Sequence, residues 1–408
     1  MTKQPKKLSY NSMGKFIFTV QGEGRGHLTQ AISMTQIARE AGHEVVGYAV
    51  GSFEGRKIPS FFTEFIGDIP LIKYESPSIS YGNGNSVQLG KTAMQAITRF
   101  KTYCKSASSL EKFVDELKPD GIVNFYESIT GLYFLKTGSK VPCMSIGHQY
   151  LLLNRHFTSI PEKRFDQFLL NLNTKFTAIG SKKFLGLSFR EMPDDFEKNI
   201  YVVPPLLRQE VKKIVPVAGK SWLMYVTHYK LADQIISWAE KNKEITLDCF
   251  WDHPEKKEVF SPSKNLTFHP IDAEKYLAKM STCAGLISTA GFESVAEAMY
   301  LKKPVMMVPV PNHIEQMINA YDGEISGAGI AAKSFDLEIF KDYLIHNRLE
   351  NNEYEVWAQK TSLKISEQLN ELIEQPSVIA ESIYLVELIN KLLSKVMQIR
   401  RLKLNKFY

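Results

Sequence analysis

Two series of short apolar segments, each alternating with helical patterns, follow one another along this chain. The first series has strand-like segments at 15–20, 44–50, 121–125 and 141–146, with helical patterns at 28–41 and 109–117. The second series has strand-like segments at 221–227, 245–251, 265–269, 285–288 and 305–309, with helical patterns at 231–241, 274–280 and 294–300. Strands that alternate with helices favour parallel sheets covered by helices on both faces. The sequence therefore predicts an α/β protein with two Rossmann-like, doubly wound domains.

A proline-rich stretch separates the two series. It contains Pro193, Pro204, Pro205 and Pro216, which suits a crossing between domains. The chain has 408 residues, too many for one ordinary core and enough for two. We place the first domain at 1–205, the second at 206–377 and a C-terminal segment at 378–408.

The overall composition narrows the class of protein. Hydrophobic residues make up 44% of the chain and charged residues 23%, as in globular proteins. Lysine and arginine exceed the acids by six, a surplus too small to imply nucleic acid as a partner. The four cysteines form no CxxC pair, so we expect free thiols in a reducing compartment. We see no signal-peptide pattern and no apolar run of about 18 residues, and we expect a cytoplasmic protein.

Basic and apolar residues interleave at the C-terminal end of the chain. Residues 391–408 carry six lysines and arginines and no acid, which predicts a basic amphipathic helix. Two interpretations stay open. The helix could touch anionic lipid headgroups at the inner face of a membrane, or it could pack back across the first domain with its basic face in water.

A glycine-rich turn, GEGRGH, follows the first strand-like segment. It contains Gly22, Gly24 and Gly26. Glycines let the backbone approach another group closely, and the helix that follows offers free N–H groups to a diphosphate. A tight turn without a ligand is the alternative. The spacing differs from GxGxxG, and no acidic residue ends the next strand, so a nicotinamide cofactor is not expected.

His27 stands where the helix after this turn begins. That position lies at the carboxyl edge of the predicted sheet, where open α/β folds bind ligands. A neutral imidazole there could accept a proton from a hydroxyl group as a general base. The alternative is a histidine that only caps the turn.

The second half has its own group of polar residues around a glycine turn. Gly291 ends a strand-like segment, Ser294 can cap the next helix, and Glu297 lies one turn further on. In one interpretation, the N-terminus of this helix binds phosphate and Glu297 binds ribose hydroxyls. Glu315 and Gln316 follow a proline-punctuated loop and could bind sugar hydroxyls. Each also has a simpler interpretation, as a first-turn acid or as ordinary helix surface.

In this order the motifs resemble GT-B glycosyltransferases. The stretch GLISTAGFESVAEAMYLKKPVMMVPVPNHIEQMINA at 285–320 is similar to the nucleotide-sugar half of the branch that contains the lipid II-forming N-acetylglucosaminyltransferase and the UDP-glycosyltransferases. The stretch GEGRGHLTQA at 22–31 is similar to that branch's GxGxGHxxRA opening. One motif lies in each half, as a GT-B fold with a central cleft requires.

The resemblance implies a role for each matched residue. Gly291 and Ser294 would lie against the donor diphosphate, and Glu297 would bind the ribose. Glu315 and Gln316 would face the donor sugar. The remaining donor contacts would be Thr227 and His228 near the phosphate or base, and His269 and Ile271 near the nucleobase. His27 would be the catalytic base.

The chain departs from the family pattern at several positions. Gln30 replaces an arginine, and Gly291-Phe292-Glu293-Ser294 stands where relatives show GGxGT or AGxxT. Where relatives often carry an aspartate that orients the histidine, this chain has Asn124, with Glu127 three residues later. Glu127 could support His27, or it could be an exposed loop acid. His148 is a rival base or an acceptor contact.

The resemblance implies an inverting, single-displacement sugar transfer with UDP-sugar as the expected donor. No DxD motif and no metal-spaced cluster is present in the sequence, so neither a metal nor a cofactor is expected. The acceptor could be a lipid, a glycan or a small molecule. A UDP-sugar 2-epimerase on the same fold and a non-catalytic nucleotide- or carbohydrate-binding protein are the alternatives.

Overall fold

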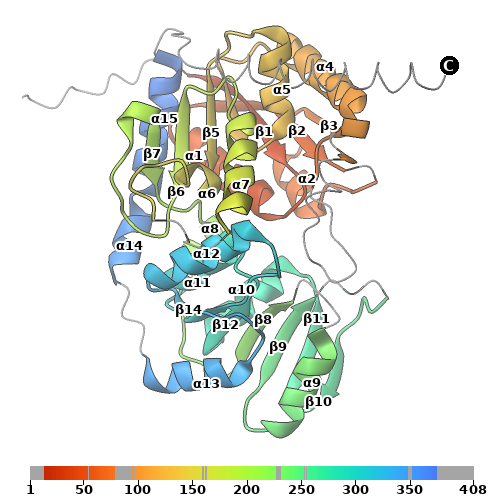
Figure 1. Ribbon diagram of the computed structural model, residues 1–408, viewed down its shortest axis with the longest axis vertical. Coiled ribbons are helices and arrows are strands. Elements are labelled where there is room, and N and C mark those ends of the chain that lie inside the picture. The colour runs from red at the N-terminus through yellow and green to blue at the C-terminus, as the bar shows by residue number, and fades with distance from the viewer. Residues whose placement is uncertain are drawn as a thin grey trace, which may run out of the picture.

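The computed structural model describes residues 13–374, apart from 54, 79–93, 96, 159, 161–162, 227–230, 252, 254 and 348–351. Thr227, His228 and the basic segment at 391–408 therefore lie outside the described residues. The chain forms two lobes, stacked one above the other in Figure 1. Each lobe is built on its own seven-stranded sheet.

The first lobe is a parallel sheet with the strand order β3-β2-β1-β4-β5-β6-β7. Its strands are β1 (Lys15–Gln21), β2 (Glu44–Ser52), β3 (Leu71–Glu75), β4 (Gly121–Phe125), β5 (Cys143–Gly147), β6 (Lys183–Leu187) and β7 (Ile200–Val203). The helices between them are α1 (Gly26–Glu40), α2 (Ser60–Ile66), α4 (Phe100–Leu117), α5 (Ser128–Thr137), α6 (His148–Leu151) and α7 (Arg164–Thr177), with a short 3₁₀ turn at Phe196–Lys198.

The second lobe has the strand order β10-β11-β9-β8-β12-β13-β14, in which only the β10–β11 pair is antiparallel. Its strands are β8 (Trp222–Val226), β9 (Leu247–Trp251), β10 (Phe260–Ser263), β11 (Leu266–Pro270), β12 (Gly285–Ser288), β13 (Val305–Met307) and β14 (Gly329–Ala331). Its helices are α8 (Gln209–Lys212), α9 (Ala232–Lys241), α10 (Ala273–Thr282), α11 (Phe292–Tyr300), α12 (Ile314–Ile325) and α13 (Leu337–His346).

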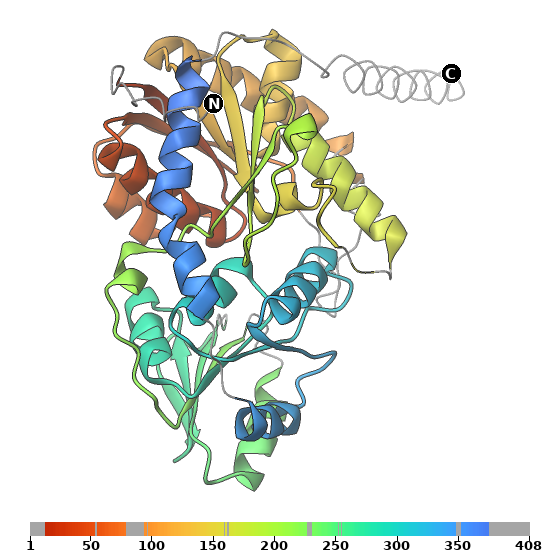
Figure 2. The ribbon, with the colours of Figure 1, turned by 90° about the vertical axis from the view of Figure 1, so that its left-hand side faces the viewer.

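The last two described helices return to the first lobe. α14 (Asn352–Gln359) leads into α15 (Thr361–Glu374), which packs against α1 and β7. Figure 2 shows α15 running along the upper lobe. The predicted second domain at 206–377 thus includes a helix that packs on the first domain. The chain therefore returns to the first lobe within 206–377, before the predicted C-terminal segment at 378–408 begins.

One apolar core extends through both lobes. It includes Phe18 of β1, Leu286 of β12, and Leu206 and Leu207 of the segment that connects β7 to α8. Two further clusters cover the opposite face of each sheet. Both sheets are therefore buried on both faces, which explains why their strands are almost continuously apolar.

Candidate active site

The glycine turn of the first lobe packs closely against two neighbours. The Gly22 N–H donates to the Gly51 carbonyl at 2.6 Å. A Cβ at Gly22 would lie 2.8 Å from Cγ1 of Val50, and a Cβ at Gly26 would lie 2.7 Å from Cδ of Glu293 in the other lobe. Gly24, in contrast, is exposed and has open space beside it. Gly26 therefore lets α1 meet the start of α11 across the inter-lobe boundary.

This contact gives a testable difference between two glycines of the same turn. We expect Gly26→Ala to push Glu293 away and loosen the junction between the lobes, because a Cβ has no room there. Overpacking of this kind costs about 1–3 kcal/mol. Gly24→Ala is the matched control and should leave the urea midpoint unchanged. Equal midpoints for the two variants would contradict the close approach of Gly26 and Glu293.

His27 lies in the first turn of α1, against β4's end. Its ring stacks on Tyr126 with 5.9 Å between ring centroids and 19° between ring planes. Its Nδ1 lies 3.2 Å from Oε1 of Gln30. The Gln30 amide group in turn donates to the Glu293 carboxylate of the second lobe. His27 is thus fixed by stacking and by one hydrogen bond.

In each lobe, a non-glycine residue with a left-handed (positive φ) backbone conformation lies just after a strand of the sheet. Tyr126 directly follows β4 with φ 58°, and Ala290 follows β12 with φ 60°. The Tyr126 hydroxyl is bonded to Thr174 at 2.9 Å. Asn319 donates to the Ala290 carbonyl at 3.0 Å. Such backbone costs free energy and persists where surrounding contacts hold it, commonly at functional sites.

Glu127 differs from both sequence-based interpretations. It is fully buried, so the interpretation as an exposed loop acid is wrong. Its Oε1 accepts from Oγ of Ser76 at 2.5 Å and from the N–H of Ile129 at 2.9 Å, which caps α5. His27 bonds to Gln30, not to Glu127. Oε1 of Glu127 is engaged by Ser76 and the helix N-terminus, its Oε2 is buried without a hydrogen-bond partner, and the described residues show no bond between this acid and His27.

The electrostatics of Glu127 follow from this burial. Desolvation raises the pKa of its carboxyl to about 7, although the bonds from Ser76 and Ile129 act in the opposite direction. Asn124, at the position where relatives carry an aspartate, is also buried. It accepts from the Glu127 N–H at 2.8 Å and donates to the Thr177 carbonyl at 2.7 Å. Asn124 therefore shapes the turn after β4 and does not reach His27.

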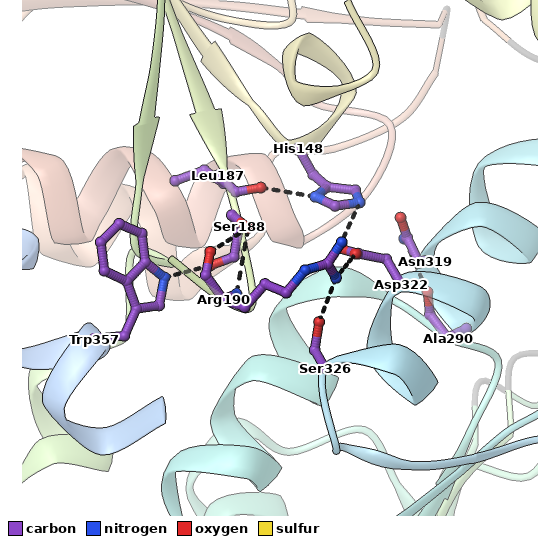
Figure 3. Close-up of polar contacts among 9 residues, drawn as sticks. All are labelled: His148, Leu187, Ser188, Arg190, Ala290, Asn319, Asp322, Ser326 and Trp357. Atoms are coloured by element: carbon purple, nitrogen blue, oxygen red, sulfur yellow. Dashed lines mark hydrogen bonds and ion pairs between the residues drawn. The ribbon is translucent and has the colours of Figure 1, made fainter. Parts of the chain in front are cut away.

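His148, the rival base, is enclosed between the lobes. Its ring stacks on Phe292 with 4.6 Å between centroids. Its Nδ1 is bonded to the Leu187 carbonyl at 2.7 Å, and its Nε2 lies 3.8 Å from Oδ2 of Asp322. Figure 3 shows His148 with Leu187 and Asp322. A histidine buried in this way lacks access to an acceptor hydroxyl.

Several hydrogen-bonded side chains lie beside His148 at the boundary between the lobes (Figure 3). Arg190, after β6, donates to the fully buried carboxylate of Asp322 on α12 and to Oγ of Ser326 at 2.8 Å. On the other side, the Trp357 indole of α14 donates to the Ser188 carbonyl at 2.9 Å. The Arg190 contacts fix α12 of the second lobe against the end of β6, and the Trp357 contact holds α14 at the same place.

The start of α11 combines open space with a tight ion pair. A Cβ at Gly291 would meet no atom within 4 Å. Glu297, one turn on, accepts from Nε and Nη2 of Arg208 at 2.6 and 2.7 Å. Burial acts to lower the pKa of Arg208, but the Glu297 carboxylate outweighs it, so the pKa is raised. Sequence reasoning missed Arg208 because no motif marks this position between the lobes.

The other residues predicted to bind the donor make contacts in several different parts of the second lobe. Oε1 of Gln316 accepts from the Val310 N–H at 2.8 Å and so holds the loop before α12. Glu315 lies close enough to Glu293 to help raise its pKa, after the larger effect of burial. Nε2 of His269 is bonded to Asp248 at 2.8 Å, and half-buried Ile271 follows β11. The His269 side chain is thus engaged by Asp248, and His269 pairs with Phe250 of β9 in the sheet.

Comparison with known proteins adds independent information. The sequence profile of glycosyl transferase family 1 matches residues 14–347. The chain belongs to this family. It is a glycosyltransferase with a GT-B fold. A search of curated proteins found no significant match.

Solved glycosyltransferase structures share the fold at low sequence identity. The glycotransferase of kitacinnamycin superposes with a TM-score of 0.60 at 13% identity, over 89% of this chain and 100% of that one. Arabidopsis thaliana UGT89C1, complexed with quercetin, gives 0.57 at 13% identity over 89% and 100%. Acinetobacter baumannii MurG gives 0.51 at 15% identity over 88% and 100%. At these identities the likeness concerns the fold alone.

In this glycosyltransferase the boundary between the lobes is nearly closed near α11. A cavity of about 10 Å³ lies there, lined by Gln30, the 205–207 segment and the first turns of α11. A larger hollow of about 330 Å³ lies between α9 and the start of α13, and none of its lining residues is a predicted site residue. Among the described residues, no cluster of His, Cys, Asp and Glu could hold a metal ion. Within the same residues, no helix is long and apolar enough to cross a bilayer.

Proposed function

We propose that this glycosyltransferase transfers a sugar from UDP-sugar to an acceptor hydroxyl, with inversion at the anomeric carbon. The proposal rests on one observation: the glycine turn that precedes His27 contacts the N-terminus of α11. Gly26 and Glu293 are in close approach there, and the open side of Gly291 lies at the same helix end. The proposed base of one lobe and the proposed anion site of the other are therefore adjacent.

The donor half of the proposal rests on α11. Sugar transfer leaves negative charge on the departing diphosphate, which free N–H groups and a helix dipole stabilise. Gly291 supplies room for phosphate oxygens, and Ser294 lies in the first turn of the helix. Glu297 would accept hydrogen bonds from the ribose hydroxyls. Its carboxylate would either bind the ribose and Arg208 together or exchange Arg208 for the ribose. Glu315 and Gln316 would face the sugar.

The acceptor half of the proposal rests on His27. A single displacement requires a base that removes the hydroxyl proton as oxygen attacks the anomeric carbon from the side opposite the diphosphate. The proton goes to the imidazole, the new C–O bond forms, and the electrons of the old bond leave with UDP. Domain closure would exclude water from this step. Lipid-linked acceptors and contact of 391–408 with a membrane remain part of the proposal.

Nucleotide-dependent stabilisation tests the donor site directly. We expect UDP to raise the stability of the protein more than GDP, dTDP or ADP, by about 2.7 kcal/mol at 100 times its dissociation constant. Differential scanning fluorimetry gives the ranking. Equal responses to all four nucleotides, or none to any, would refute a UDP site.

One substitution can separate phosphate binding from folding. Gly291 has φ −67° and ψ 130°, which any residue can adopt, and space for a side chain. Gly291→Asp should therefore fold normally and cap α11 well, yet its carboxylate should repel the diphosphate and abolish the UDP shift. Gly291→Asn is the matched neutral control and should lose less of the UDP-induced shift.

A separate experiment distinguishes sugar transfer from epimerisation. Because an epimerase needs no acceptor, conversion of UDP-sugar to its epimer in the absence of an acceptor would identify that activity.

A further inference from the structure

Gln30 forms a hydrogen-bonded bridge between the two lobes at the proposed base. Its side chain is 2% exposed. On one side its Oε1 lies 3.2 Å from Nδ1 of His27. On the other side its Nε2 donates to Oε1 of Glu293. The order is therefore His27, Gln30, Glu293, with the first two on α1 and the third on α11.

The chemistry of the three groups sets the direction of this chain. The Gln30 amide NH₂ faces Oε1 of Glu293, which accepts its hydrogen bond. The group that faces His27 is then the amide oxygen, which only accepts. Nδ1 of His27 must therefore carry the proton. Its Nε2 is left with the lone pair that a general base requires.

We propose that Gln30 and Glu293 are positioning residues that hold His27 in the Nδ1–H tautomer, with Nε2 as the basic atom. This inference rests on the proposed function of His27 as base. Because Glu293 belongs to the second lobe, the complete chain exists only when α11 lies against α1. The orientation of the base is thereby coupled to closure of the two lobes.

The acid nearest the family position makes other contacts. Glu127 is bonded to Ser76 and to the N-terminus of α5. Glu315 and His27 are the charged groups that act on Glu293. Burial raises the pKa of the Glu293 carboxyl, His27 and Gln30 act against this rise, and Glu315 adds to it. The direction of the chain requires an ionised Glu293, and burial disfavours that state, so the spectra are recorded over a rising pH series that includes pH 8.

The tautomer of His27 can be measured without any substrate. The full-length protein is labelled with ¹⁵N-histidine, and long-range ¹H–¹⁵N spectra at pH 8 give the state of each ring nitrogen. The signals lost in His27→Ala identify His27. We expect Nδ1 with a protonated-nitrogen shift and Nε2 with a lone-pair shift. A protonated Nε2 in the wild type would overturn the proposal.

Two near-isosteric variants test the chain itself. Gln30→Met removes both hydrogen bonds, and Glu293→Gln can donate as well as accept, so that the Gln30 amide is free to turn over. Both should give a mixture of His27 tautomers. Gln36→Met, two turns along α1 and half-buried, is the matched control and should keep the wild-type spectrum. An unchanged His27 tautomer in Gln30→Met would overturn the proposal.

Kinetics separate this inference from the proposed function. Gln30→Met and Glu293→Gln should lower kcat on the order of tenfold or more, with little change in donor KM, because only the orientation of the base is affected. A rise in donor KM without loss of kcat would overturn the positioning role. If the tautomers respond as expected but His27→Ala keeps full activity, the hydrogen-bond chain stands and His27 is not the base.

Discussion

Replacement of His27 by alanine is expected to lower kcat for sugar transfer by a factor of about 10²–10⁴, the usual contribution of a general base. Affinity for UDP should change little, because the proposed donor contacts lie on the second lobe around Gly291 and Glu297. Steady-state release of UDP with an accepting hydroxyl compound measures the first quantity. The nucleotide-induced rise in melting temperature measures the second.

His346 offers a matched control for this experiment. It lies at the end of α13, exposed and bonded only within its own helix to the Asp342 carbonyl. His346→Ala should have wild-type kcat. If His27→Ala retained more than a tenth of the wild-type kcat, another group would have to take the proton. Equal loss in both variants would point to a general folding defect.

The fold could be predicted from the sequence where strands are apolar and follow a clear helix. The segment at 121–125 and the segment at 285–288 coincide with β4 and β12. β7 was missed because its four residues lie in the proline-rich stretch that we took for a crossing. β3 was missed because Lys73 and Glu75 interrupt an edge strand, and β14 because it has only three residues.

The candidate site was predictable to a lesser degree, because motifs identify backbone more readily than side-chain partners. The glycine turn and the start of α11 stand out in the sequence, and the structure brings them together at Gly26 and Glu293. The partner of His27 was not predictable. Glu127 is close in sequence to the family's acidic position, but burial and helix capping fix it elsewhere, whereas Glu293 comes from the other lobe.

Replacement of Arg208 by methionine is expected to destabilise the protein by about 3 kcal/mol. The substitution leaves the Glu297 carboxylate buried, with 5% of its side chain exposed and both hydrogen bonds from Arg208 lost. A buried charge without its partner typically costs 3–5 kcal/mol. Urea unfolding followed by tryptophan fluorescence measures the change, since Trp222, Trp238 and Trp251 all lie in the second lobe.

An exposed ion pair gives the matched control. Lys136 and Glu111 are 2.5 Å apart, with 41% and 37% of their side chains exposed. Lys136→Met should cost no more than about 1 kcal/mol, because water replaces the lost partner. If Arg208→Met cost no more than Lys136→Met, the Arg208–Glu297 pair would be solvated and its burial would be wrong.

A second substitution then tests what the Arg208–Glu297 pair contributes. Buried pairs replaced on both sides by apolar residues are often neutral or stabilising, so Arg208→Met combined with Glu297→Met should recover most of the lost stability. The coupling energy of this double-mutant cycle is the relevant number. A recovered double variant that no longer responds to UDP would mean that stability does not require the pair but ligand binding does. Arg208 would then serve to hold the Glu297 carboxylate at the place where the proposed function needs an acceptor for ribose hydroxyls.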